Sequence, residues 1–72
     1  MPKLPILSGL EVVKVLTKNG FLFRSRKGSH VVLVKDGRLV TVPQHYELTP
    51  FVLSSIIRQT GMEREVFLKL FK

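Results

Sequence analysis

The 72-residue sequence contains no cysteine, no tryptophan, and only five acidic residues and two histidines. Without cysteine the chain can form no disulfide and offers no thiolate to a metal. The histidines and acidic residues are scattered rather than set at metal-ligand spacings, so we expect no metal and no other cofactor. A chain without cysteine also fits a reducing compartment, and we expect a cytoplasmic protein.

Long apolar runs are absent as well. The opening MPKLPILSGL contains two prolines, and we expect it to be neither a signal peptide nor a membrane span. A chain of this length is expected to form one domain over residues 1–72. Its core should be modest, because so short a chain hides only about 60% of the surface that its unfolded form exposes.

Basic residues dominate the charge: twelve lysines and arginines give a net charge of +7 and a pI near 10.4. A small basic domain suits a polyanion, most often nucleic acid, whereas the plainer alternative is a surface that only keeps the chain soluble. Clustering favours the polyanion, because one fifteen-residue window with a single acid, Asp36, contains five cations. These cations are Arg24, Arg26, Lys27, Lys35 and Arg38.

A capping signal marks the first helix. Ser8 is followed three residues later by Glu11, which is the spacing of a capping box. Asn19-Gly20 provides a stop signal, since glycine readily takes the left-handed conformation that ends many helices. The pattern therefore predicts a helix over residues 9–19.

Two further helices are predicted in the second half of the chain. Thr49 followed by Pro50 is a typical helix start, and Gly61 is a suitable end. Residues 63–71 can form a short third helix. Apolar residues recur at helical intervals in all three segments and are assigned to the core. They are Leu10, Val13, Leu16, Val52, Leu53, Ile56, Ile57, Val66, Phe67 and Leu70.

The middle of the chain predicts three strands. Residues 21–25, 29–35 and 38–43 are rich in β-branched and aromatic side chains. Residues 26–28 are expected to form the first turn, and Asp36-Gly37 is a strong signal for a two-residue type I′ hairpin turn. The predicted fold is therefore α+β, with the order α-β-β-β-α, a three-stranded antiparallel sheet and a short C-terminal helix.

Both faces of the second strand are apolar in the middle. Val31 and Leu33 lie on one face, and Val32 and Val34 lie on the other, although two short helices can cover only one. Either the second face simply reflects the preference of β-branched residues for strands, or it is a protein interface. Three aromatic residues leave a similar choice between the core, which we favour, and partner contact: Tyr46, Phe51 and Phe71.

The Asp-Gly turn allows the strand register to be predicted. With those two residues as the loop, His30 faces Pro43. If pairing continues past Pro43, His45 becomes the diagonal neighbour of His30, roughly 7–8 Å away on the same face. The preceding turn brings Arg26 and Lys27 to the same end of the sheet. The only two histidines are therefore expected to converge beside cations.

Two imidazoles beside cations could cleave RNA without a metal. One would take the proton of the ribose 2′-hydroxyl, the other would protonate the leaving 5′-oxygen, and a cation would stabilise the charged phosphorane. Histidine suits either proton transfer because it titrates near neutral pH. On this pattern alone, a surface or hydrogen-bonded histidine remains the more common explanation.

Three segments, in order, resemble the HicA-type toxins of toxin–antitoxin systems, the YcfA-like mRNA interferases. They are SGLEVVKVLTKNGF, KGSHVVL and TVPQHYELTPFVLSSIIRQTGM, and the resemblance covers nearly all of residues 8–68. It implies a fold like that of a double-stranded-RNA-binding domain, cleavage of mRNA, and a HicB-type antitoxin as partner. A homodimer is kept as an alternative to a monomer.

The resemblance also implies site residues. The family's catalytic histidine in Gly-Ser-His corresponds to His30, with Gly28 and Ser29 as motif neighbours. His45 matches a histidine that relatives tend to have after Val-Pro, and its catalytic role is inferred from the register alone. The five clustered cations then become candidate RNA-binding residues.

The sequence departs from the family pattern in two segments. Val31 and Val32 stand where many relatives have a second histidine or an aromatic residue, and Phe51 stands where many have glycine. These departures affect the details of the site and the start of the second helix, but they leave His30 in place.

Two other functions remain open. The chain could be a non-catalytic module that reads duplex RNA by its shape, or an inactive toxin that only binds its antitoxin. The first is disfavoured because known modules carry cations at the start of the last helix, whereas this segment has none before Arg58. The intact Gly-Ser-His motif argues against the second.

Overall fold

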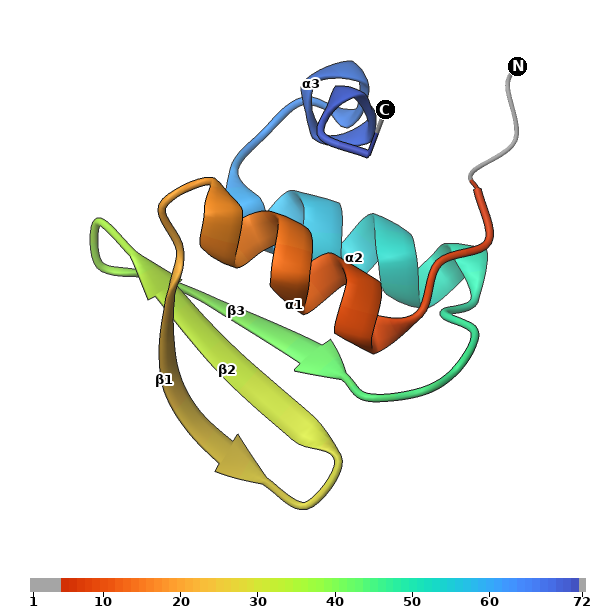
Figure 1. Cartoon of the computed structure of the whole chain (residues 1–72). Coiled ribbons are helices and arrows are strands. Elements are labelled where there is room, and N and C mark those ends of the chain that lie inside the picture. The colour runs from red at the N-terminus through yellow and green to blue at the C-terminus, as the bar shows by residue number, and fades with distance from the viewer. Residues whose placement is uncertain (1–4, 72) are drawn as a thin grey trace.

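A computed structural model of the chain describes residues 5–71 and shows an α+β fold with the predicted order of elements (Figure 1). The single domain was predicted over residues 1–72, of which 1–4 and 72 lie outside the described part. The elements are α1 (Gly9–Lys18), β1 (Leu22–Lys27), β2 (His30–Lys35), β3 (Arg38–Pro43), α2 (Pro50–Thr60) and α3 (Arg64–Lys69). The strands form one antiparallel sheet in the order β1-β2-β3.

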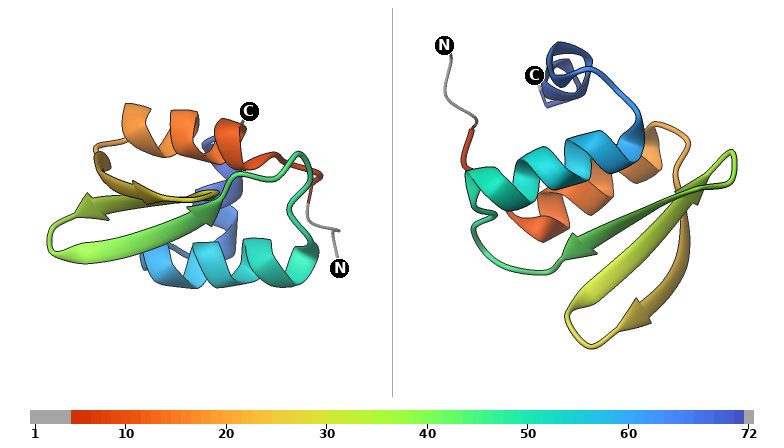
Figure 2. Two further views of the ribbon diagram at one scale, coloured as in Figure 1. Left: turned by 90° about the horizontal axis from the view of Figure 1, so that it is seen from below. Right: turned by 180° about the vertical axis from the view of Figure 1, so that it is seen from behind.

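The helices lie on one side of the sheet. α1 and α2 run side by side over one face, and α3 lies beyond them (Figures 1 and 2). The turn between β1 and β2 lies at the end of the molecule farthest from α3, and every residue of β1 is exposed. The buried apolar residues are Leu7, Val12, Leu16, Phe21, Val31, Leu33, Val40, Val42, Leu48, Leu53, Ile56, Ile57 and Phe67. In the part of the chain that the structure describes, no helix is long and apolar enough to span a membrane.

Local capping chemistry explains where α1 and α2 begin. The Ser8 side chain accepts a hydrogen bond from the Glu11 amide, and the Glu11 carboxylate accepts one from the Ser8 amide, so the predicted capping box is present. The Thr49 hydroxyl accepts a hydrogen bond from the Val52 amide at the start of α2. α2 ends at Thr60 and is capped by Gly61, whose φ of 77° is a left-handed value that suits glycine.

The β2–β3 hairpin confirms the predicted register. Asp36 and Gly37 have φ values of 51° and 77°, as a type I′ turn requires. Lys35 pairs with Arg38, and His30 pairs with Pro43 at the other end of the hairpin. A two-residue loop therefore suffices to place each residue of β3 opposite its partner.

The first turn differs from the prediction. β1 continues to Lys27, and the loop before β2 consists only of Gly28 and Ser29. Gly28 has a φ of 59°, the left-handed value that glycine takes at the first position of a type II′ turn. The predicted turn over residues 26–28 was therefore wrong. The turn lies later in the chain, because a two-residue turn can begin at the glycine itself.

The two edges of the sheet differ. On β3, the Thr41 amide donates a 2.8 Å hydrogen bond to the Gln59 side chain of α2, and Pro43 has no amide hydrogen to donate. The edge formed by β1 is exposed throughout, and its pairing with β2 is irregular between Phe23 and Ser25. Only the β3 edge is therefore closed by contacts within the described chain.

Two residues assigned to the core are exposed. Leu10 is 56% exposed and Val66 is 49% exposed. The buried stripe of α1 passes through Gly9, Val12 and Leu16, and Leu10 lies about 100° or more around the helix from each of them. α3 has only six residues and buries Phe67, which leaves its neighbour Val66 outside.

The exposure of the side chains also shows which of the three undecided aromatic residues belong to the core. Tyr46 is 100% exposed and Phe51 is 85% exposed, so the favoured core assignment was wrong for both. Phe71 is half-buried against the core, with its ring centroid 5.1 Å from that of Phe67. Phe21 lies outside β1, contrary to the predicted strand over 21–25, and it is buried.

The uncovered face of the sheet carries an apolar patch. Val32 and Val34 are half-buried there, and the cross-strand partners of Val34 are Leu22 and Leu39, which are both exposed. The predicted second apolar face is therefore real, and the helices leave it open.

Candidate functional site

His30 is the first residue of β2 and lies next to the tight Gly28-Ser29 turn. It pairs with Lys27 of β1 on one side and with Pro43 of β3 on the other, so the three side chains share the uncovered face. Because this end of the hairpin extends beyond the helices, the imidazole of His30 is exposed. The turn therefore presents a histidine and an ammonium group together.

A second cation is held close to the same turn. The Nε atom of Arg26 donates a 3.1 Å hydrogen bond to the carbonyl oxygen of Gly28. This bond draws the guanidinium group of Arg26 toward the loop, while the other nitrogens of the group can still donate. Lys27 and His30 therefore share the uncovered face, whereas Arg26, which pairs with the buried Val31, belongs to the opposite face and is held at the turn by its bond to Gly28.

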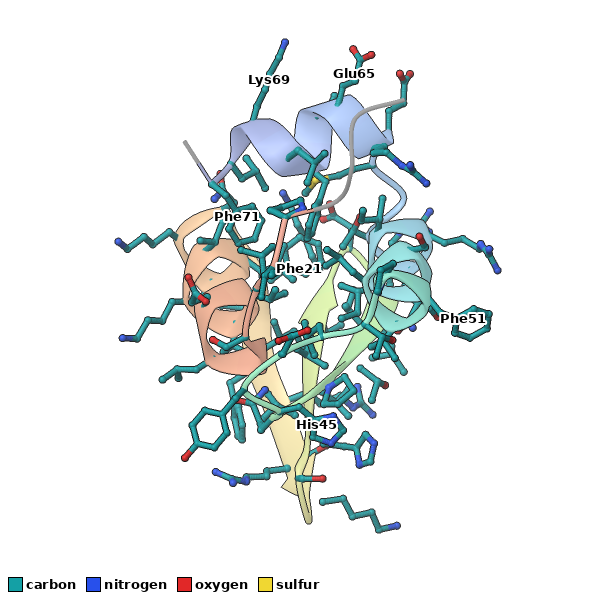
Figure 3. The ribbon with its side chains drawn as sticks, turned by 90° about the vertical axis from the view of Figure 1, so that its right-hand side faces the viewer. Phe21, His45, Phe51, Glu65, Lys69 and Phe71 are labelled. Atoms are coloured by element: carbon teal, nitrogen blue, oxygen red, sulfur yellow. The ribbon has the colours of Figure 1, made fainter. Side chains whose placement is uncertain are left out.

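The exit of β3 lies beside this turn. The Gln44 amide donates a 2.6 Å hydrogen bond to the carbonyl oxygen of Ser29, so pairing continues one residue beyond Pro43. The next carbonyl oxygen, that of His45, accepts a 2.9 Å bond from the Gly9 amide at the start of α1. Figure 3 shows His45 at the end of the molecule opposite α3. Both exposed histidines therefore lie at this end.

The start of α1 fits tightly against the β3 exit. A β-carbon added to Gly9 would overlap the carbonyl oxygen of Pro43 and would lie 2.9 Å from the Cα atom of Gln44. Only a residue without a side chain allows this approach. Gly9 therefore helps to fix the position of the His45 backbone. Neither the capping box nor the apolar spacing in the sequence indicated this role.

Lys35 and Arg38 lie at the other end of the hairpin. Lys35 is five residues from His30 along β2, which corresponds to about 17 Å. Its Nζ atom donates a 3.0 Å hydrogen bond to the carbonyl oxygen of Asn19 and lies 5.4 Å from the centroid of the Phe21 ring. An RNA strand would have to span the hairpin to contact these cations as well as His30. Arg24 is exposed where the β1 pairing is irregular.

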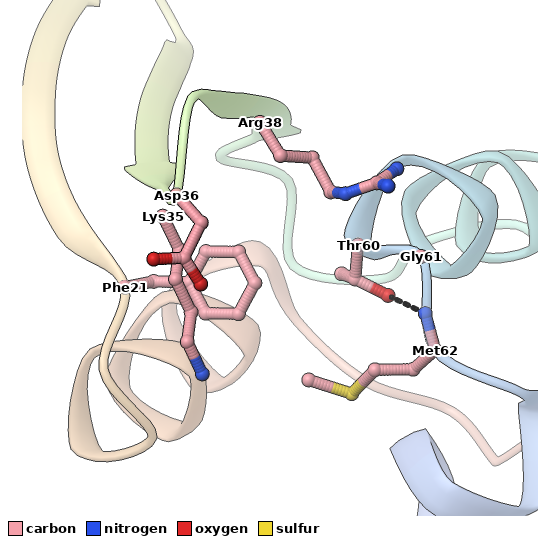
Figure 4. A pocket seen from close by; sticks show the side chains of 7 residues that line it. All are labelled: Phe21, Lys35, Asp36, Arg38, Thr60, Gly61 and Met62. Atoms are coloured by element: carbon pink, nitrogen blue, oxygen red, sulfur yellow. Dashed lines mark hydrogen bonds between the residues drawn. The ribbon is translucent and has the colours of Figure 1, made fainter.

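A small cavity lies at that far end. It has a volume of about 210 Å³ and is drawn in Figure 4. The Thr60 hydroxyl inside it accepts a 3.1 Å hydrogen bond from the Met62 amide. The lining residues are Phe21, Lys35, Asp36, Arg38, Thr60, Gly61 and Met62. The cavity contains neither histidine and is separate from the site at the Gly28-Ser29 turn.

The described residues, 5–71, contain no group of three or more histidine, cysteine or acidic side chains that could hold a metal ion. The candidate groups near this end of the sheet are the imidazoles of His30 and His45, the side chains of Arg26 and Lys27, and backbone amides. Such a set can transfer protons and bind phosphate.

Comparison with known proteins places this arrangement in a family. Residues 9–62 match the family model described as HicA toxin of bacterial toxin-antitoxin. One chain of a solved toxin–antitoxin complex from Streptococcus pneumoniae has 36% sequence identity and a TM-score of 0.66, over 78% of this chain and 98% of that one. No curated protein matches the sequence. The chain belongs to the HicA toxin family of bacterial toxin–antitoxin systems.

Proposed function

We propose that the protein is the toxin of a toxin–antitoxin pair and acts as a ribonuclease on mRNA in the cytoplasm. The observation that supports this most is the exposed His30, which shares a sheet face with Lys27 at a turn beside the β3 exit and His45. The net charge of +7 favours an RNA substrate, since it attracts a polyanion to the molecule. An antitoxin protein is the proposed partner, because the similar chain comes from a toxin–antitoxin complex.

The proposed reaction is a transesterification at one phosphodiester: the 2′-oxygen attacks the adjacent phosphorus to form a 2′,3′-cyclic phosphate, and the bond from phosphorus to the 5′-oxygen breaks. His30 acts as general base or general acid: it takes the proton of a 2′-hydroxyl, or it protonates the leaving 5′-oxygen. His45 is the candidate for the complementary step. Arg26 and Lys27 bind the phosphate and stabilise the negative charge that builds up on it in the transition state. A site exposed on a protruding hairpin suits a substrate as large as mRNA.

Replacing a single 2′-hydroxyl tests the reaction. The wild-type protein should cut an RNA oligonucleotide in the presence of EDTA, and it should not cut the same oligonucleotide once the 2′-hydroxyl at the cleaved position is replaced by hydrogen. Gel analysis of end-labelled oligonucleotides measures both. Tight binding without any cut in either substrate would instead support the non-catalytic RNA-binding module.

The two ends of the hairpin should respond differently when a lysine is replaced. Lys27→Met should weaken RNA binding and lower the slope of log K against log salt concentration by about 1, because one phosphate contact is lost. Lys35→Met should leave that slope unchanged and lower the free energy of unfolding by about 1 kcal/mol, since it removes the bond to the Asn19 carbonyl oxygen. Salt titrations and thermal unfolding of both variants measure the contrast. A lowered slope in Lys35→Met would show that the far end also contacts RNA.

A further inference from the structure

Tyr46 combines an aromatic ring with complete exposure. Its side chain is 100% exposed, although a tyrosine usually buries much of its ring area in a folded protein. Single apolar residues on a surface are common and carry little information by themselves. What distinguishes Tyr46 is its place in the chain, directly after His45 and close to the turn that presents His30.

The backbone is fixed on both sides of Tyr46. Before it, Gln44 is bonded to Ser29, and the carbonyl oxygen of His45 is bonded to Gly9. After it, the amide of the buried Leu48 donates a 2.8 Å hydrogen bond to the carbonyl oxygen of Leu7. The ring therefore projects from a short segment that is tied at both ends. The backbone around Tyr46 therefore loses little conformational freedom when a ligand stacks on the ring, and the side chain itself has only two torsions to fix.

The distance to the proposed reaction centre suits a neighbouring nucleotide. Directly paired strand residues such as Ser29 and Gln44 have Cα atoms about 5.5 Å apart. Two further residues add at most about 7 Å. The Cα atom of Tyr46 therefore lies within about 13 Å of Ser29, the neighbour of His30. A nucleotide next to the one bound at His30 can span this distance.

We infer that Tyr46 stacks on an unpaired base of the RNA and so positions single-stranded substrate at His30. The inference rests on the proposed ribonuclease function and adds to it the class of substrate. Aromatic side chains bind bases whose faces are free, and in a duplex those faces are already stacked. The cations near the turn bind phosphates, and Tyr46 supplies the contact with a base.

The chain offers a direct spectroscopic test, because Tyr46 is its only tyrosine and it contains no tryptophan. Fluorescence excited at the tyrosine band therefore reports on this ring alone. In the His30→Ala background, in which cleavage should be slow, a single-stranded RNA oligonucleotide should quench the signal. Tyr46→Ala should weaken binding of that oligonucleotide about 5- to 100-fold, as loss of one stacking contact predicts, and Tyr46→Phe should not.

Controls separate this inference from the proposed function. If RNA quenches the tyrosine fluorescence but the wild-type protein cleaves no RNA, the stacking contact would be supported and the ribonuclease function would be rejected. If Tyr46→Ala cleaves RNA with the same KM as the wild type, the stacking contact would be rejected and the ribonuclease function would be supported. Equal quenching by a duplex of the same sequence would overturn the single-strand preference. Loss of antitoxin binding in Tyr46→Ala, with RNA binding intact, would assign the ring to a protein contact and overturn the inference.

Discussion

His30→Ala should reduce RNA cleavage by about 10²- to 10⁴-fold, the contribution typical of a positioned acid or base. The side chain is exposed, so its removal should leave thermal unfolding almost unchanged. In cells under tight induction, the wild type should arrest growth and degrade mRNA, whereas the variant should do neither. Single-turnover cleavage of an RNA oligonucleotide gives the rate ratio, and circular dichroism confirms that the variant is folded.

His45→Ala is the matched control, because the second histidine is also exposed and lies at the same end of the molecule. A loss comparable to that of His30→Ala would support a reaction shared by both imidazoles. Full activity in His45→Ala would show that His45 takes no part in the reaction and that His30 acts without it. Equal growth arrest and RNA degradation by the wild type and His30→Ala would show that His30 is not catalytic.

Gly9→Ala should destabilise the fold more than any surface substitution. The added methyl group would meet the carbonyl oxygen of Pro43 and the Cα atom of Gln44, and backbone atoms cannot rotate away as a side chain can. Overpacking of this kind costs about 1–3 kcal/mol, which lowers the melting temperature of so small a domain by roughly 5–20 °C. Because the Gly9 amide also holds the His45 carbonyl oxygen, the NMR signals of that imidazole should shift.

Leu10→Ala provides the comparison for this prediction. Leu10 is the next residue in α1 and is exposed, so its truncation should change the free energy of unfolding by at most about 0.5 kcal/mol. Thermal unfolding of the two variants under the same conditions isolates the effect of the close approach. Identical melting of Gly9→Ala and the wild type would mean that α1 can move away from the β3 exit without cost.

Local chemistry made much of the fold predictable from the sequence. The capping box of Ser8 and Glu11 links residues three apart, and the Asp36-Gly37 turn needs only its own two residues. Each of these signals is short-range, so the sequence contains all of its parts. The register of β2 and β3 followed from the turn, and it brought His30 and the exit toward His45 to one end.

Contacts between distant segments were not predictable in the same way. The bond from Lys35 to Asn19 and the approach of Gly9 to Pro43 each depend on how α1 sits on the sheet. The same placement decides that Leu10 faces outward although it fits a helical repeat. Sequence spacing gives the period of an apolar stripe, but it does not say which of two adjacent stripes faces the sheet.

The unequal edges of the sheet bear on self-association. A second copy cannot easily lengthen the sheet at β3, where Gln59 occupies the Thr41 amide and Pro43 has none. It would have to add at β1, and antiparallel pairing of two such strands would set arginines and a lysine of one copy close to those of the other. At low ionic strength this repulsion should oppose edge-to-edge assembly, and added salt should screen it. The basic surface thus gives the open edge of the sheet a salt-dependent protection against aggregation.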